Sequence, residues 1–434
     1  MLRAAGRTLL LGILAVFIQA QQEPAALLSR VRARAEDTYR RLPNYMCTQT
    51  VDRTESHPVH QPAVNSCDQR AAERKVRPVY SDRLRLDVAA SSEGELYSWV
   101  GESRFHERGL FDLVKQGSMS TGSFRGFLGS VFHNDGVTFT YLGETSEKGR
   151  LLASYGFRVP LENSHYVFGP TGHRALTGYD GTFQVDPKTA DLVRLVILID
   201  RPPPETGACE SSTTMDYGLV RLNDTDFQLP TQTHLHIRNM DGAEMDNTTV
   251  YSGCHEFVGE SEVTFGPPGA VPAAESEPVR EPALALPEGV PFRLVLTQDI
   301  PTATAAAGDR IAAKLATAIH DASRQVLVPA GTPVVCRILR ISDDYSGVPV
   351  VTILFRLEAL EIDGAARPFN AIVDSKVQTF DRGRGALLRN VELGTLEDIL
   401  RERGVAKLRF WGVPRDYLVK RGMESNWVTG KGGP

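Results

Sequence analysis

The chain has 434 residues, of which 41% are hydrophobic and 23% are charged, so its composition is that of a globular protein with two or three domains. With 48 Lys and Arg against 53 Asp and Glu, the formal net charge is −5, and this balance argues against non-specific nucleic-acid binding. The 5 Cys, 38 Gly and 26 Pro exclude disulfide-dense and collagen-like classes.

The N-terminus predicts a secretory signal peptide over residues 1–20. Arg3 and Arg7 precede an apolar stretch from Thr8 to Ala20, which is shorter than the roughly 20 residues of a transmembrane helix. We place the cleavage site after Ala20, and retention of the segment as an anchor is the alternative. After cleavage, the chain is expected to be periplasmic or secreted, without a transmembrane anchor.

A helical period follows the signal peptide. From about Pro24 to Leu42, apolar residues recur on one face and arginines fill most of the remainder. We expect one amphipathic helix, ended by Pro43 and Asn44, with its arginines on a solvated face. Contact of these arginines with acidic lipid or with a partner is the alternative.

After residue 44 the hydrophobic period changes from helical to two, which predicts strands. The clearest strand, Arg83–Val88, alternates apolar and charged side chains, as in an antiparallel sheet with one covered face. Turn signals such as Asp241–Gly242 separate many of the strands. One helix and about ten strands predict a curved antiparallel sheet, a half-barrel covered by the amphipathic helix, over residues 21–265. The expected strands are Tyr45–Arg53, Arg83–Val88, Leu96–Gly101, Thr138–Leu142, Leu152–Val159, Tyr166–Gly169, Gly181–Val185, Leu192–Asp200, Thr213–Val220, Thr231–Arg238 and Thr248–Phe257.

The order of these elements, together with the stretches Asn44–Thr50, Gly178–Asp186 and Tyr251–Cys254, resembles the periplasmic lipoprotein-carrier and lipoprotein-receptor superfamily. The resemblance covers about residues 24–265. It implies a half-barrel lined by apolar side chains, with a cavity for a lipid, an acyl chain or another hydrophobic ligand. A filled core without any ligand is the alternative.

Export changes how the cysteines are interpreted. In an oxidising compartment Cys47, Cys67, Cys209 and Cys254 are candidates for two disulfides. Loop closure favours local pairing, Cys47 with Cys67 and Cys209 with Cys254, whereas a bond between Cys47 and Cys254 would join the two ends of one domain. No C-x-x-C spacing indicates a zinc ribbon or a redox pair. Cys336 is expected to be a small buried side chain on a strand.

A second domain is predicted beyond a linker. Residues 266–285 are rich in Pro, Ala and Glu and are expected to be semi-extended. Residues 286–434 are expected to form a small β-barrel-like domain with a C-terminal helix and hairpin. The expected strand-like runs are Leu286–Leu296, Gly308–Leu315, Val326–Val335 (with a turn at Pro329–Gly331) and Val350–Glu358; the helix is Leu396–Arg403, and the hairpin joins Leu408–Trp411 to Asp416–Val419.

Residues 286–375, and above all the phrase VLVPAGTPVVCRIL, resemble the small β-barrel domain of the conjugal-transfer and type IV secretion core component. Cys336 occupies a position where Gly is more usual in that family, and the family's membrane-anchoring helix upstream of the barrel is missing. The resemblance implies a structural or assembly role in the cell envelope, so we expect the barrel to dock to another envelope protein.

The search for reactive motifs yields no catalytic residue, metal ligand or cofactor. His234 and His236 face the same side of a predicted strand, but no third ligand is evident near them. His57 and His60 lie in a loop with Pro58, and neither histidine pair is predicted to hold a metal. Ser120 lacks the first Gly of a nucleophile elbow, and no phosphate-binding glycine loop precedes a helix.

These observations predict an exported, non-enzymatic, mainly β protein of two domains. Its N-terminal half-barrel is expected to bind a hydrophobic ligand, and its C-terminal barrel to dock to an envelope partner. A purely structural or assembly module of the cell envelope is the first alternative. A secreted hydrolase, which would need a His or two acids converging in a polar pocket, is the second.

Overall fold

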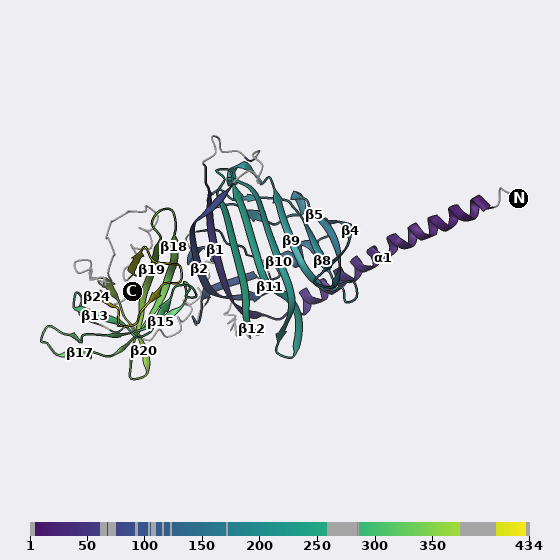
Figure 1. The fold of residues 1–434 in the computed structure, drawn as a ribbon. Helices are drawn as coiled ribbons and strands as arrows, with labels where there is room; N and C mark the ends of the chain where they lie inside the picture. The colour runs from purple at the N-terminus through teal and green to yellow at the C-terminus, as the bar shows by residue number, and fades with distance from the viewer. Residues whose placement is uncertain are drawn as a thin grey trace, which may run out of the picture. The chain divides into compact units, whose positions relative to one another are not determined.

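Strands dominate both units into which the chain divides (Figure 1). Unit 1 contains Met1–Arg77 and Asp87–Val258, and unit 2 contains Pro78–Leu86 and Gly259–Pro434. The segment Pro78–Leu86 thus groups with unit 2, although it lies inside the predicted N-terminal domain. This computed structural model describes residues 5–60, 67, 75–91, 94–102, 105, 110–114, 117–121, 124–170, 172–257, 284, 286–373 and 405–430, without the side chains of residues 5–22 and 111–112.

The helices and strands of the first part of the chain follow the predicted order closely, because period-two alternation marks most of the strands. They are α1 (Ala5–Arg41), β1 (Tyr45–Pro58), β2 (Val76–Ser91), β3 (Gly94–Trp99), α2 (Leu110–Leu113), α3 (Gly126–Phe132), β4 (Thr138–Glu147), β5 (Arg150–Val159), η2 (Leu161–Asn163), β6 (Val167–Phe168), β7 (Ala175–Leu176), β8 (Tyr179–Val185), β9 (Leu192–Asp200), η3 (Pro204–Thr206), β10 (Ala208–Leu222), β11 (Thr225–Asn239) and β12 (Glu244–Glu256).

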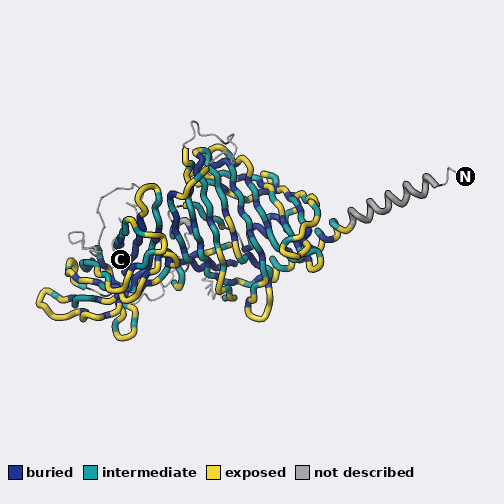
Figure 2. The backbone as a smooth tube through the Cα atoms, in the orientation of Figure 1, coloured by how far each residue is buried: buried dark blue, intermediate teal, exposed yellow. Residues whose placement is uncertain are grey.

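Unit 1 is built on one curved antiparallel sheet, as predicted. Its strands pair in the order β4–β5–β8–β9–β10–β11–β12–β1, and every pairing is antiparallel. Most of these strands run side by side in Figure 1. Buried and less buried residues alternate along them in Figure 2, so the sheet has one covered face and one outer face.

The covered face carries the core of unit 1, and two helices pack on it. Leu27 and Val31 of α1 and Phe127 of α3 cluster with buried side chains of β5, β8, β9 and β10, among them Phe183 and Ile197. Residues three or four apart on a helix share one face, which is why the apolar stripe of α1 meets the sheet continuously. The amphipathic helix covers the sheet, as expected.

The arginines of helix α1 lie on a largely solvated face, as expected, and two of them also contact neighbouring segments of unit 1. Arg34 Nε lies 2.5 Å from Asp191 Oδ1, and Arg30 Nη2 donates to the Pro187 carbonyl oxygen at 3.0 Å. Arg34 remains about half exposed, so this ion pair orients the helix more than it stabilises it. The helix runs through the predicted cleavage position after Ala20, and cleavage stays a prediction.

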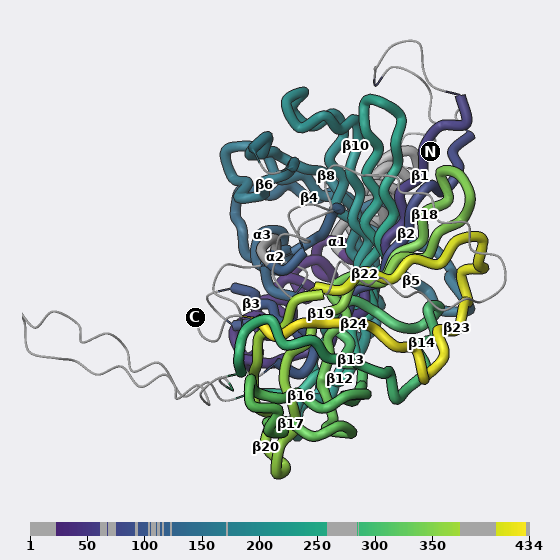
Figure 3. The backbone as a smooth tube through the Cα atoms, turned by 90° about the vertical axis from the view of Figure 1, so that its left-hand side faces the viewer, coloured from purple at the N-terminus to yellow at the C-terminus, as the bar shows by residue number. Residues whose placement is uncertain are grey.

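Unit 2 is a small barrel, again as predicted. Strand β13 pairs with β15, β15 with β18, β18 with β19 and β19 with β20, whereas β21 follows β20 in the chain and pairs with β24, which pairs back with β13. Figure 3 shows β24, in yellow, beside β13, in green. Pro78–Leu86 of β2 adds to this unit by pairing with β18. The strands are β13 (Pro291–Leu296), β14 (Ile300–Pro301), β15 (Arg310–Leu315), β16 (Ile319–His320), β17 (Val326–Val328), β18 (Pro333–Asp344), β19 (Val350–Ile362), β20 (Ala365–Pro368), β21 (Ala371–Val373), β22 (Val405–Trp411), β23 (Leu418–Val419) and β24 (Glu424–Thr429).

The interior of the barrel is filled by side chains from all of its long strands. Trp427 and Phe355 pack with ring centroids 5.9 Å apart, and both are fully buried. Cys336 is free and fully buried on β18, which confirms the expectation for this residue. Among described residues, Arg337 is the largest charged side chain without solvent exposure, and it is neutralised by Glu358.

The predicted terminal hairpin is wrong. Strand β22 pairs with β19, and β23 pairs with β14, so the segments around Leu408–Trp411 and Asp416–Val419 bond to other strands. The buried side chains of β22 pack in the barrel because β22 pairs with β19. This pairing is long-range, so the local sequence pattern does not predict it. The predicted helix Leu396–Arg403 and most of the linker 266–285 lie outside the described residues.

Candidate functional site

A cavity of about 1160 Å³ opens on the covered face of unit 1. Its walls come from α3, from the ends of β10, β11 and β12, and from two loop segments, 117–121 and 165–170. This volume exceeds the roughly 300–1,000 Å³ of common small-molecule pockets. The cavity lies next to the core of unit 1, so its inner wall continues the apolar surface that the helices cover elsewhere.

The inner wall of the cavity is aromatic and aliphatic. Phe127 and Phe168 are buried there, and Leu235, Ile237 and Met245 reach it from β11 and β12. Leu235 and Ile237 are two residues apart and Met245 is paired with Ile237, so the sheet register places all three on the covered face. A ligand entering this space would replace water on hydrocarbon surface, which favours an apolar ligand.

Two tyrosines add weakly polar groups to the wall. The Tyr179 hydroxyl lies 2.8 Å from Ser130 Oγ on α3, and burial raises the pKa of Tyr179. Burial likewise raises the pKa of Tyr166 to about 12. Both phenols therefore stay neutral at physiological pH and can act as hydrogen-bond groups without introducing charge into the cavity.

Serine side chains occupy the loop side of the cavity. Asn247 Nδ2 donates to the Ser118 carbonyl oxygen at 2.7 Å and so ties this loop to β12. Ser120 Oγ is buried and has no hydrogen-bond partner among the described residues. No histidine of the described part of the chain therefore contacts this hydroxyl as a catalytic base would. An unpaired buried hydroxyl is costly, and a polar group of a bound ligand would satisfy it.

Charged side chains lie at the exposed part of the wall. His165, Arg174 and Asp241 all line the cavity and are exposed. These three residues are thus at the opening, whereas Phe127 and Phe168 are inside. This distribution suits an amphiphile whose chain is buried and whose polar end faces water.

Glycines bring backbone close to neighbouring groups at two places on the cavity wall. Gly169 has φ +117°, and a Cβ there would stand 2.4 Å from the His173 carbonyl oxygen. Gly117 has φ +80°, and a Cβ there would meet the Arg53 guanidinium. Both positions have a positive φ, a backbone conformation that favours glycine.

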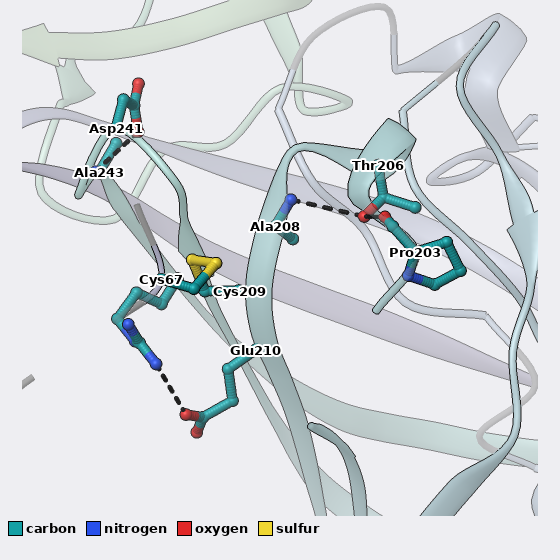
Figure 4. Close-up of a disulfide and its surroundings, with 9 residues drawn as sticks. Cys67, Pro203, Thr206, Ala208, Cys209, Glu210, Asp241 and Ala243 are labelled. Carbon is teal, nitrogen blue, oxygen red and sulfur yellow. Dashed lines mark hydrogen bonds and ion pairs between the residues drawn. A yellow bond between two sulfur atoms is a disulfide. The ribbon is translucent and has the colours of Figure 1, made fainter. Parts of the chain in front are cut away.

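The disulfide Cys67–Cys209 lies next to the cavity rim (Figure 4). Cys209 follows Ala208, a lining residue, at the start of β10. Thr206 Oγ1 donates to the Pro203 carbonyl oxygen at 2.7 Å and holds the η3 turn on the same rim. Asp241 Oδ1 accepts a bond from the Ala243 backbone amide at 2.9 Å and fixes the turn between β11 and β12.

The four predicted cysteines do form two disulfides, but not with the local pairing that loop entropy favours. Cys47 bonds to Cys254 across 207 residues, and Cys67 bonds to Cys209 across 142. Sheet pairing overrides loop closure, because β1 and β12 are neighbours and bring Cys47 and Cys254 within 4.1 Å at their Cα atoms. The Cys47–Cys254 bond therefore joins the two ends of unit 1, as in the alternative pairing considered for this cysteine.

The two predicted histidine pairs differ in the structure. His57 lies on β1, not in a loop, and its Nε2 is 2.7 Å from Glu55 Oε1, whereas His60 follows the strand. His234 and His236 do share the outer face of β11, opposite the cavity, as the alternation predicts. A cavity was implied by the resemblance, but its lining residues were not predicted, since its loops carry no strong motif, although Leu235 and Ile237 alternate clearly with the two histidines.

Comparison with known proteins gives only distant matches. No family model matches the sequence, and no curated protein matches it. A DUF1329 family protein from Desulfovibrio piger has 10% identity and a TM-score of 0.27, covering 55% of this chain and 94% of that one. A domain named for outer-membrane lipoprotein sorting from Vibrio parahaemolyticus has 9% identity and a TM-score of 0.26, covering 54% and 93%.

A LolA-superfamily protein from Nitrosomonas europaea has 8% identity and a TM-score of 0.25, covering 54% of this chain and 94% of that one. None of the helices in the described part of the chain combines the length and apolar content needed to span a bilayer.

Proposed function

We propose that unit 1 is a non-enzymatic binding module that holds a lipid or an acyl chain in the cavity of its covered face. The observation that carries the proposal is the cavity itself, about 1160 Å³ with Phe127, Phe168 and Met245 on its inner wall and charged groups at its opening. Burial of an acyl chain in this cavity would contribute roughly 25 cal/mol of binding free energy for each Å² of apolar surface removed from water.

Native mass spectrometry of the full-length protein, followed by solvent extraction, tests the proposal directly. We expect a co-purifying lipid or fatty acid in the native spectrum. After delipidation, a fluorescent fatty acid should bind with one-to-one stoichiometry. A protein that carries no lipid and takes up no fatty acid would contradict the proposal and favour a purely structural or assembly module.

A pair of variants on one strand makes the test specific to the cavity. Met245→Trp places a large ring in the cavity and should weaken fatty-acid binding by at least about tenfold, because it occupies the ligand volume. Val250→Trp is the matched control, since Val250 is 46% exposed on the same strand, β12. Equal binding by the two variants would place the ligand elsewhere.

The hydrolase alternative is not favoured by the described residues. Ser120 Oγ has no hydrogen-bond partner, and the remaining wall is mostly apolar. General base catalysis needs the base within hydrogen-bond reach of the nucleophile. Activity assays with acyl esters are expected to show no turnover above the rate of a Ser120→Ala variant.

We further propose that unit 2 is a docking module for an envelope protein, as the resemblance of residues 286–375 implies. Its antiparallel strand pairing and filled core support a rigid scaffold rather than a second ligand carrier. Cross-linking in cells followed by affinity purification should recover a stable partner with the full chain. Recovery of the same partner after residues 286–434 are deleted would contradict this role.

We also propose that the chain is exported and cleaved after Ala20. The two disulfides are consistent with an oxidising compartment. Intact-mass measurement of the protein from a periplasmic or secreted fraction should give a chain that begins at Gln21. A chain that still begins at Met1 would contradict cleavage and favour the retained anchor.

A further inference from the structure

A cluster of metal-ligand side chains lies on the outer face of unit 1, away from the cavity. His234 and His236 project from β11, and Asp246 and Glu244 project from the neighbouring strand β12. The register pairs His236 directly with Asp246, so the carboxylate falls beside both rings. The third ligand that the sequence left unidentified is therefore supplied by the adjacent strand.

The distances within this cluster match those of a metal site. Asp246 Oδ1 lies 2.9 Å from His236 Nδ1 and 3.3 Å from His234 Nε2. Ligand atoms of His236, Glu244 and Asp246 all lie within 4.8 Å of one another. Nitrogen and oxygen ligands at about 2.0–2.2 Å from a tetrahedral zinc ion stand ~3.4 Å apart, so the two Asp246–histidine distances are close to that spacing, and the side chains of His234 and Glu244 must shift to complete the set.

We infer that His234, His236, Asp246 and Glu244 form a binding site for one divalent transition-metal ion of the zinc class. Two imidazoles with carboxylates favour zinc, copper or nickel over magnesium and calcium, which prefer oxygen ligands alone. Two histidines at positions i and i+2 of a strand present their rings on one face, and the paired strand completes the set without a loop rearrangement.

A compensated cation lies on the same strand as the two histidines. Arg238 is two residues beyond His236 on β11, and its Nη2 is paired with Glu210 Oε2 at 3.3 Å. This pair keeps the guanidinium charge compensated beside the site.

Uptake of zinc by the full-length, disulfide-bonded protein tests the inference. After chelator treatment and buffer exchange, native mass spectrometry and isothermal titration with zinc chloride should give one equivalent of bound ion. The double variant H234A/H236A should lose that equivalent. His255→Ala is the matched control, because His255 is exposed on β12 and its ring contacts the Gly253 carbonyl oxygen instead; it should bind zinc as the parent does.

Copper as a spectroscopic probe identifies the ligands in the parent protein, independently of whether a variant folds. Electron paramagnetic resonance of the one-to-one copper complex should show two imidazole nitrogens, and His234→Gln should reduce this number to one. Absence of zinc uptake by the parent protein would overturn the inference. Retention of the bound equivalent in a folded H234A/H236A variant, or copper without nitrogen ligands, would overturn it as well.

Discussion

Arg337 Nε lies 2.5 Å from Glu358 Oε1, and the arginine is completely buried between the strands of unit 2. The guanidinium also donates from Nη1 to the Gly308 carbonyl oxygen at 2.8 Å. A buried cation is tolerated only when a counter-charge and hydrogen bonds replace its hydration. Glu358 therefore supplies counter-charge to a cation that lies inside the barrel.

Replacing that carboxylate should destabilise unit 2. In Glu358→Gln the buried Arg337 loses the negative charge of Glu358, and we expect a loss of about 3 kcal/mol in the free energy of unfolding. Urea titration followed by tryptophan fluorescence measures it, because Trp411 and Trp427 both belong to unit 2. Glu361→Gln is the control, since Glu361 is exposed on the same strand; equal midpoints for the two variants would contradict the prediction.

Gly169 and Gly172 form a matched pair of backbone positions in unit 1. Both have positive φ, +117° for Gly169 and +87° for Gly172. A Cβ at Gly169 would stand 2.4 Å from the His173 carbonyl oxygen, whereas a Cβ at Gly172 would have no atom within 4 Å among the described residues. Gly169→Ala should therefore destabilise unit 1 by about 2 kcal/mol more than Gly172→Ala. Thermal unfolding by circular dichroism compares them; similar losses would mean that the loop accommodates the side chain.

Buried phenols predict a stability that falls at alkaline pH. Burial raises the pKa of Tyr155 and of Tyr166 to about 12, whereas an unfolded tyrosine titrates near 10. Between these values the unfolded chain has lost protons that the folded chain retains, so the free energy of unfolding decreases as pH rises from about 10 to about 12. Below about pH 10 both forms are protonated, and this contribution is constant.

Absorbance at alkaline pH checks the sign of this effect. Ionisation of the buried tyrosines should coincide with loss of the native circular dichroism, and Tyr166→Phe should move the alkaline transition to higher pH. Complete tyrosine ionisation below about pH 11 in a protein that keeps its native spectrum would contradict the assignment of the raised pKa values.

The sheet of unit 1 was predictable because its strands have alternating patterns and short turns. The turn at Asp241–Gly242 also sets the register of β11 and β12. If the two strands pair antiparallel with residue 241 at the centre of the turn, His236 lies opposite Asp246. The juxtaposition of His236 with Asp246 is thus contained in the sequence, but it becomes visible only when the two strands are paired across this turn.

The cavity and the barrel pairings could not be predicted in the same way. Phe168, Met245 and Ser120 reach the cavity from segments far apart in the chain, and nothing in the local pattern of any one segment encodes that convergence. Strand β22 is followed closely in sequence by β23, with which it could form a hairpin. It pairs instead with β19, where its buried side chains enter the barrel core. Long-range packing decides between pairings that local propensity leaves equal.

The nested disulfides impose an order of events on synthesis. Cys47 and Cys67 are both made long before Cys209 and Cys254, and an oxidant acting on the growing chain would meet the first two alone. Their bond would be non-native, because each has its native partner in the last third of unit 1. Maturation of this protein therefore requires either that oxidation waits for β12 or that an isomerase exchanges the early bond.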